Sequence, residues 1–97
     1  MKARITAASR IAASQEQVSC DLGGEAAILN LENSVYYGLD VVGARIWTLL
    51  QNPTTVAAVR DVIVREYDVE TDRCERDLIA LLQRLAAEGL IAIESTG

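Results

Sequence analysis

The first half of the chain alternates between apolar and polar residues, a period of two that is typical of half-buried strands. Val18, Cys20 and Leu22 alternate with polar neighbours, so residues 17–22 are predicted as a strand with these three side chains toward the core. The pair Gly23-Gly24 follows and is a strong signal for a two-residue hairpin turn. A second strand is expected over residues 25–31, a turn over 32–34 and a third strand over 35–39. Short strands joined by tight turns predict an antiparallel three-stranded sheet.

From Asp40 onward the apolar residues recur at spacings of three and four, which indicates helices. Asp40 is a good N-cap for a first helix that ends before Pro53. Thr54 or Thr55 is expected to cap a second helix. In the first helix the predicted apolar stripe is Val42, Ile46, Leu49 and Leu50, with Trp47 on its flank. In the second helix it is Val56, Val59, Ile63 and Tyr67.

A third helix is predicted from about Thr71 to Glu88, with Gly89 as its left-handed stop. A short final strand is expected over residues 90–93. The main apolar stripe of the third helix is predicted to be Cys74, Leu78, Leu81 and Leu85.

Strands followed by helices predict one α+β domain that resembles a winged helix-turn-helix, with a three-stranded antiparallel sheet followed by three helices. The expected bounds are a flexible N-terminal arm over residues 1–15, the domain over 16–94 and a tail over 95–97. The arm is rich in Ala and Ser, although Ile5 and Ile11 could pin part of it as an edge strand.

Composition narrows the classes of function. The chain has 97 residues, a net charge of −5 and a single lysine, Lys2, so clustered basic residues for nucleic acid are lacking. No signal peptide opens the sequence and no apolar run is long enough for a membrane span. We therefore expect a cytoplasmic protein with neither nucleic acid nor membrane as its partner.

Catalytic chemistry is disfavoured by the residue types present. The chain contains no histidine, which removes Ser-His and Cys-His nucleophile pairs. Cys20 and Cys74 are too far apart in sequence to indicate a metal site and are expected as small core residues. No phosphate-binding loop is present. We predict a protein without catalytic residues, metal or cofactor.

A DNA-binding transcriptional regulator is the alternative that the predicted fold suggests. Its recognition helix would begin at Thr71, and Arg73 and Arg76 could contact phosphates. Asp72, Glu75 and Asp77 would meet the same phosphates, however, so the charge pattern disfavours this function.

The third strand offers a different kind of site. Residues 35–39 are apolar and aromatic, without proline or charge, and an open edge here would suit the addition of an extended peptide as a further strand. The residues alone leave open whether this strand is an edge or a central strand.

Five sequence segments resemble PqqD-like proteins. They are Val35-Tyr36-Tyr37-Gly38-Leu39-Asp40-Val41-Val42-Gly43-Ala44-Arg45-Ile46-Trp47, then Thr55-Val56, Tyr67-Asp68-Val69, Asp77-Leu78 and Leu82-Gln83-Arg84-Leu85-Ala86-Ala87-Glu88-Gly89-Leu90. The tyrosine-rich start of the first segment and its end, residues 43–47, are most similar to the stand-alone members from lasso-peptide biosynthesis. The resemblance covers about residues 18–93. Asp40 stands where the broader family more often has Asn, and both residue types cap helices.

The resemblance implies a recognition element that binds the leader of a ribosomally made precursor peptide. The leader would add as a strand beside the third strand, against the third helix, and be delivered to a leader protease and a cyclase. An apolar or aromatic leader side chain is expected to anchor near Val35 and Tyr37. The peptide-binding residues implied are Ser34, Val35, Tyr36, Tyr37, Gly38, Arg73, Arg76, Asp77 and Ala80.

Overall fold

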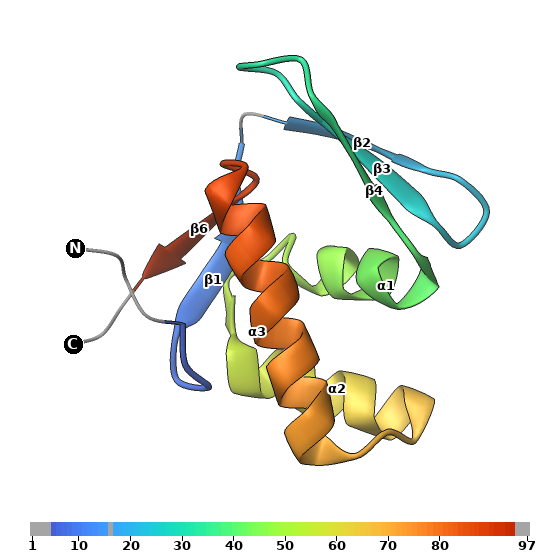
Figure 1. The fold of residues 1–97 in the computed structure, drawn as a ribbon, viewed down its shortest axis with the longest axis vertical. Helices are drawn as coiled ribbons and strands as arrows, with labels where there is room; N and C mark the ends of the chain where they lie inside the picture. The colour runs from blue at the N-terminus through green and yellow to red at the C-terminus, as the bar shows by residue number, and fades with distance from the viewer. Residues whose placement is uncertain (1–4, 16, 95–97) are drawn as a thin grey trace.

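Residues 17–39 form the antiparallel sheet that the alternation predicts. In the computed structural model, which describes residues 5–15 and 17–94, the sheet has the order β2 (Gln17–Asp21), β3 (Ala26–Asn30) and β4 (Tyr36–Leu39) (Figure 1). Gly23 and Gly24 adopt φ values of 74° and 104°, and Leu22 donates to the carbonyl of Glu25 at 2.8 Å. The two positive φ angles are what a two-residue hairpin turn requires, so the predicted turn is confirmed.

Only one face of this sheet is buried. Ile28 on β3 is fully buried, and its partner across the ladder is Tyr37 on the same face. Val18 pairs with Leu29 and Cys20 with Ala27, which places both β2 side chains on the opposite face.

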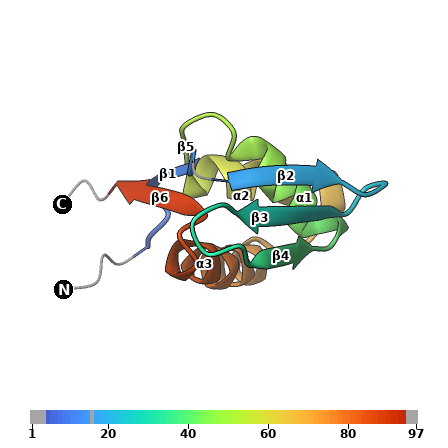
Figure 2. The same cartoon turned by 90° about the horizontal axis from the view of Figure 1, so that it is seen from above.

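The prediction that Val18, Cys20 and Leu22 face the core is therefore wrong. Val18 is 55% exposed and Leu22 58% exposed, and Cys20 is exposed as well. The physical reason is that the helices cover only the inner face of the sheet (Figure 2), and the register places these side chains on the other face.

Helix α1 (Val41–Leu49) begins where Asp40 caps it, since Asp40 Oδ1 accepts from the Gly43 amide at 2.8 Å. The helix buries Ile46 and Trp47, whereas Val42 is 37% exposed. Trp47 was predicted on the flank of the stripe and Val42 within it. The buried face is rotated toward Trp47 because α1 packs under the sheet and beside α2.

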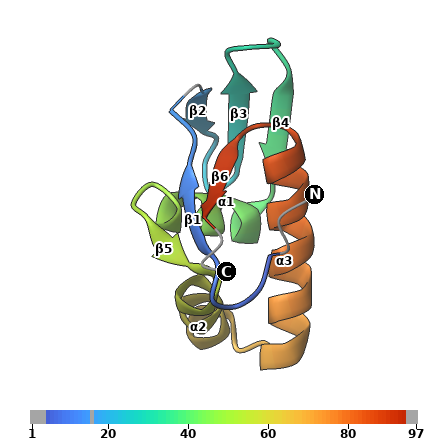
Figure 3. The same ribbon diagram turned by 90° about the vertical axis from the view of Figure 1, so that its left-hand side faces the viewer.

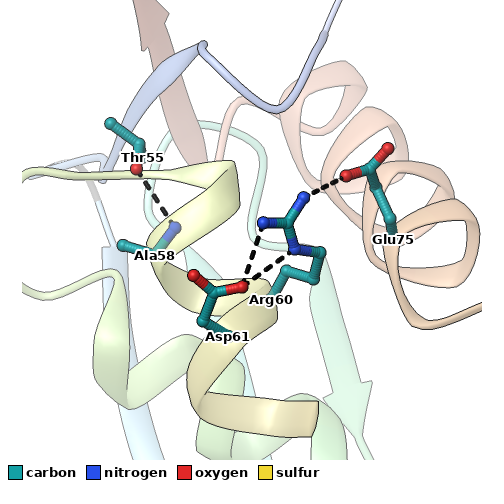
Figure 4. Close-up of polar contacts among 5 residues, drawn as sticks. All are labelled: Thr55, Ala58, Arg60, Asp61 and Glu75. Carbon is teal, nitrogen blue, oxygen red and sulfur yellow. Dashed lines mark hydrogen bonds and ion pairs between the residues drawn. The ribbon is translucent and has the colours of Figure 1, made fainter. Parts of the chain in front are cut away.

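Helix α2 (Val56–Tyr67) is capped by Thr55, whose hydroxyl accepts from the Ala58 amide at 3.1 Å (Figure 4). Arg60 joins this helix to the next one: its guanidinium contacts Asp61 at 3.0 Å and Glu75 at 2.6 Å. Glu75 lies on α3 (Thr71–Ala87), so this ion-pair network connects the two helices.

Helix α3 begins and ends as predicted. Gly89 follows it with φ of 72°, and Leu90 donates back to the Leu85 carbonyl at 2.9 Å. One position of its apolar stripe differs from the prediction. Leu82 is fully buried, whereas Leu81, which was predicted in the main stripe, is only partly buried. The buried side chains of α3 are Cys74, Leu78, Leu82 and Leu85.

A second, smaller sheet has the order β5 (Thr54–Thr55), β1 (Arg10–Ala13) and β6 (Ile91–Glu94). The central strand is β1, with Ile11 paired to Ile93 on one side and to Thr54 on the other. Ile11 is 2% exposed and Ile5 is 6% exposed.

Part of the expected arm is therefore held in place, as the expectation for Ile5 and Ile11 allowed. Only residues 10–13 of it form a strand, and that strand is central and not at an edge, because β5 and β6 pair with it from both sides. Residues 1–4 of the arm, and the expected tail at 95–97, lie outside the described residues.

The two sheets and three helices share one core, and α3 runs past both sheets (Figure 3). Within residues 5–15 and 17–94, no helix is long and apolar enough to cross a membrane.

Candidate functional site

Strand β4 is an edge strand, which resolves the question that the residues alone leave open. Its one partner among the described strands is β3, and the other side of β4 faces α3 (Figure 2). The Asn30 amide donates to the Val35 carbonyl at 3.0 Å, so the carbonyl of Val35 points toward β3. Because these directions alternate in an antiparallel ladder, Tyr37 also faces β3. The N–H and C=O groups of Tyr36 and Gly38 face the open edge.

A groove of about 840 Å³ runs beside this edge. Four elements surround it: β4, the first half of α1, the end of α2 and the length of α3. The groove is lined by Tyr37, Gly38, Leu39, Asp40, Val42, Gly43, Ile46, Ile63, Tyr67, Val69, Glu70, Arg73, Cys74, Asp77, Leu78, Leu81 and Arg84.

The groove combines a buried apolar floor with accessible apolar walls. Ile46, Ile63 and Leu78 are buried and form part of the protein core. Val42 and Val69 are 37% and 41% exposed, although both are apolar. Accessible apolar side chains beside an open strand edge are typical of surfaces that receive a peptide.

One contact that the sequence reasoning missed joins the sheet to the helix beside the groove. Asn30, only 4% exposed, donates from Nδ2 to the carbonyl oxygen of Glu88 at 2.6 Å. Its Oδ1 accepts from the Glu32 amide at 2.9 Å. The bond joins the end of β3 to the C-terminal end of α3, so the sheet and the helix are held together at that end. The sequence did contain a signal for this contact: Asn30 is a polar residue at an inward-facing position of the strand predicted over residues 25–31.

The polar rim of the groove is carried mainly by α3. Arg73 and Asp77, one turn apart, approach to 3.9 Å, and their side chains are 77% and 75% exposed. Because both side chains are exposed, the pair contributes little to the free energy of unfolding. For the same reason, both side chains are accessible to a ligand.

No cluster of three or more His, Cys, Asp or Glu suited to a metal ion occurs within the described part of the chain. Burial raises the pKa of the Cys74 thiol, and the nearby Asp77 and Glu75 carboxylates raise it further against the opposing effect of Arg60. A raised pKa keeps the thiol protonated and therefore poorly nucleophilic.

The implied peptide-binding residues divide into three groups. Tyr37, Gly38, Arg73 and Asp77 line the groove, and Tyr36 presents backbone groups at the open edge. Ser34 and Val35 belong to the turn before β4: Ser34 has a left-handed φ of 60°, and the Val35 amide donates to Asn33 Oδ1 at 3.0 Å. Arg76 and Ala80 are exposed positions of α3 that do not line the groove.

Several lining residues were not named from the sequence as peptide contacts. Val42 and Leu81 were assigned to the core, and only their partial exposure reveals them as groove walls. Arg84 follows Arg73 and Asp77 at helical spacing, and that spacing was the signal that could have found it.

Comparison with known proteins agrees with this geometry. The family model described as coenzyme PQQ synthesis protein D (PqqD) matches residues 25–91. The structure of TbiB1 in complex with the TbiA(beta) leader peptide has a TM-score of 0.78 and 36% sequence identity, covering 89% of this chain and 98% of that one. The structure of lasso peptide synthetase B1 complexed with the leader peptide has a TM-score of 0.75 and 24% identity, covering 84% and 96%.

The second structure is similar in fold alone. Among curated proteins, none matches this chain. Because the family match spans more than half of the chain and the similarity to TbiB1 extends over nearly all of both molecules, the chain belongs to the PqqD family.

Proposed function

We propose that this protein binds the leader segment of a ribosomally made precursor peptide, which adds as a strand to the open edge of β4. The observation that carries the proposal is the edge itself, whose free Tyr36 and Gly38 backbone groups lie beside an accessible apolar groove. The 36% identity with TbiB1, a protein solved with a leader peptide, supports the same function.

The affinity of such a complex would come mainly from side chains. Each backbone hydrogen bond contributes about 0.5–1.5 kcal/mol, and ordering a flexible peptide opposes this gain. An apolar or aromatic leader side chain would rest on Tyr37, Val42 and Leu81, which line the groove. Val35, first expected as part of this anchor, lies outside the lining, so the anchor is now proposed farther along β4.

The proposed biological role is delivery and not catalysis. The bound leader would be presented to a leader protease and a cyclase, as the resemblance to lasso-peptide proteins implies. A role as a non-catalytic partner agrees with the high pKa of Cys74 and with a groove whose walls are largely apolar. The protein would act in the cytoplasm, where precursor peptides are made.

The test is a titration of ¹⁵N-labelled protein with the leader of the precursor peptide encoded beside its gene. Amide signals of residues 36–42 and of the groove face of α3 are expected to shift. The variant Gly38→Pro removes one outward N–H without removing a bond to β3, and edge strands tolerate proline. Binding should weaken in this variant.

Gly38→Ala is the matched control, because a Cβ at this position meets no atom within 4 Å. It should bind as the original chain does. Equal binding by Gly38→Pro and Gly38→Ala, or amide shifts confined to other surfaces, would contradict strand addition at β4.

The alternative of a DNA-binding regulator has weaker support. Arg73 and Arg76 of α3 stand among Asp72, Glu75 and Asp77, and Arg73 contacts Asp77. Salt-dependent binding of duplex DNA would favour this alternative, and no retention of DNA at low salt would remove it.

A further inference from the structure

Arg84 is a charged residue of the groove that the structure leaves without a counterion. It lies in the last turn of α3, is exposed and lines the groove. Within the described chain it forms neither an ion pair nor a side-chain hydrogen bond, whereas Arg45, Arg60 and Arg73 each contact a carboxylate.

Charge is distributed unevenly along the groove. The bond from Asn30 to Glu88 holds the C-terminal end of α3 beside the start of β4, and Arg84 lies one turn before Glu88. The carboxylates of Asp40 and Glu70 line the groove where β4 ends and α3 begins.

The remaining two charges lie between these ends and compensate each other. Arg73 and Asp77 approach to 3.9 Å. The groove is therefore basic at the end near Tyr36 and Tyr37, and acidic at the other end.

We propose that Arg84 determines specificity by pairing with an acidic side chain of the bound leader. This inference rests on the proposed function, because it assigns a charge to one position of the peptide that adds to β4. The carboxylate would lie on the groove face of the peptide, at the end near the start of β4. A basic side chain there would meet Arg84 and be rejected, so the pairing would also fix the register of the leader along the strand.

The helix dipole offers a simpler role for Arg84, since a cation in the last turn of a helix is stabilising. That role predicts a small loss of stability when Arg84 is replaced, and no change in which peptides bind. A preference for one sign of charge in the ligand separates the two roles.

The experiment is a selection of random displayed peptides on the immobilised original chain, on Arg84→Glu and on Arg76→Glu. Arg76 is the matched control: it lies on the same helix, is exposed, and does not line the groove. Both variants change the net charge by the same amount. Thermal unfolding verifies that each variant is folded before selection.

The original chain and Arg76→Glu are expected to enrich Asp or Glu at one position of the selected peptides. Arg84→Glu should enrich Lys or Arg at that position. One selected acidic peptide should bind about tenfold more weakly to Arg84→Glu, and replacing its acidic residue with Lys should restore affinity for that variant.

Two negative results have different meanings. If selected peptides shift the amides of β4 and Arg84→Glu keeps the acidic preference, or no preference occurs at all, the role of Arg84 is overturned and strand addition stands. If selected peptides shift only amides outside the groove, the proposed function fails and this inference fails with it.

Discussion

The side-chain amide of Asn30 donates a 2.6 Å hydrogen bond to the carbonyl oxygen of Glu88, joining the end of β3 to the end of α3. The sheet and the helix that border the groove are thereby held together at one end. Asn30 also accepts from the Glu32 amide, so one buried side chain organises the turn before β4 and the helix opposite it.

Replacing Asn30 with Ala should lower the free energy of unfolding by about 1–3 kcal/mol, because two partly buried hydrogen bonds are lost and a carbonyl is left without its donor. Urea unfolding followed by circular dichroism measures this change. The affinity for the leader should fall as well, since the sheet and the helix beside the groove are no longer joined at this end. Asn33→Ala, in the same turn but without a contact to α3, is the control. Equal losses in the two variants would show that the bond to Glu88 contributes nothing.

Tyr36 and Tyr37 are neighbours that face opposite sides of the sheet. Tyr37 packs against the core and lines the groove, whereas Tyr36 is 71% exposed on the outer face. Tyr37→Ala should weaken leader binding at least about tenfold, as expected for losing a large apolar contact. Tyr36→Ala should change it little, because only its backbone takes part. Calorimetric titration tests this pair, with Tyr37→Phe to separate the ring from the hydroxyl. A larger effect at Tyr36 would place the peptide on the other face.

The two cysteines should differ in reactivity. Burial raises the pKa of the Cys74 thiol and shields it, whereas Cys20 is exposed. Iodoacetamide at mildly alkaline pH should therefore modify Cys20 first and Cys74 only slowly. Mass spectrometry of proteolytic fragments over time measures both rates. Bound leader should slow Cys74 further, since Cys74 lines the groove. Modification of Cys74 as fast as Cys20 would contradict the packing described for α3.

Arg45 and Glu66 form a bidentate pair at 2.9 and 2.8 Å. Part of the free energy of unfolding should therefore depend on pH in the acidic range. The hydrogen bonds from Arg45 hold the pKa of Glu66 below its ordinary value, against the opposing effect of desolvation. A lowered pKa means that the contribution is present above the unfolded value of about 4.3 and is lost as pH falls through the folded value. The difference in urea midpoint between the original chain and Glu66→Gln should therefore be constant near neutral pH and shrink in acid. Arg45→Gln should behave in the same way. A difference that persists unchanged in acid would contradict the pairing.

Local signals in the sequence predicted the ends of the elements well. Asp40 and Thr55 cap helices, and Gly89 stops one, because each acts through atoms within a few residues of itself. The positive φ angles of Gly23-Gly24 are of the same kind. These positions could be predicted without knowledge of the tertiary structure.

The choice of buried face was harder to predict. On β2, the alternation is genuine, but the apolar set of Val18 and Cys20 faces outward because the helices do not cover that side. On α3, Leu81 and Leu82 are adjacent leucines, and only the placement of the groove decides which one is fully buried. Strand β1 has little intrinsic strand preference and depends on pairing with β5 and β6.

The candidate site was indicated by the resemblance to PqqD-like proteins, since the residues alone left open whether residues 35–39 form an edge strand. Of the residues that the resemblance implies, Tyr37, Gly38, Arg73 and Asp77 line the groove. Val42 and Arg84 were missed as groove residues because their place in the lining depends on how α1 and α3 lie relative to β4.

The central position of β1 in the small sheet also bears on how the chain folds. Ile11 pairs with Thr54 and with Ile93, so β1 waits for two partners, β5 and β6, that follow it at a distance along the chain. Such long-range pairing raises the contact order and slows the closing step of folding. On the ribosome, β2, β3 and β4 can form hairpins with their neighbours while β1 is still unpaired. The small sheet would therefore form last, once β6 has left the exit tunnel. Its formation would connect β1, near one end of the described residues, to β6 at the other end.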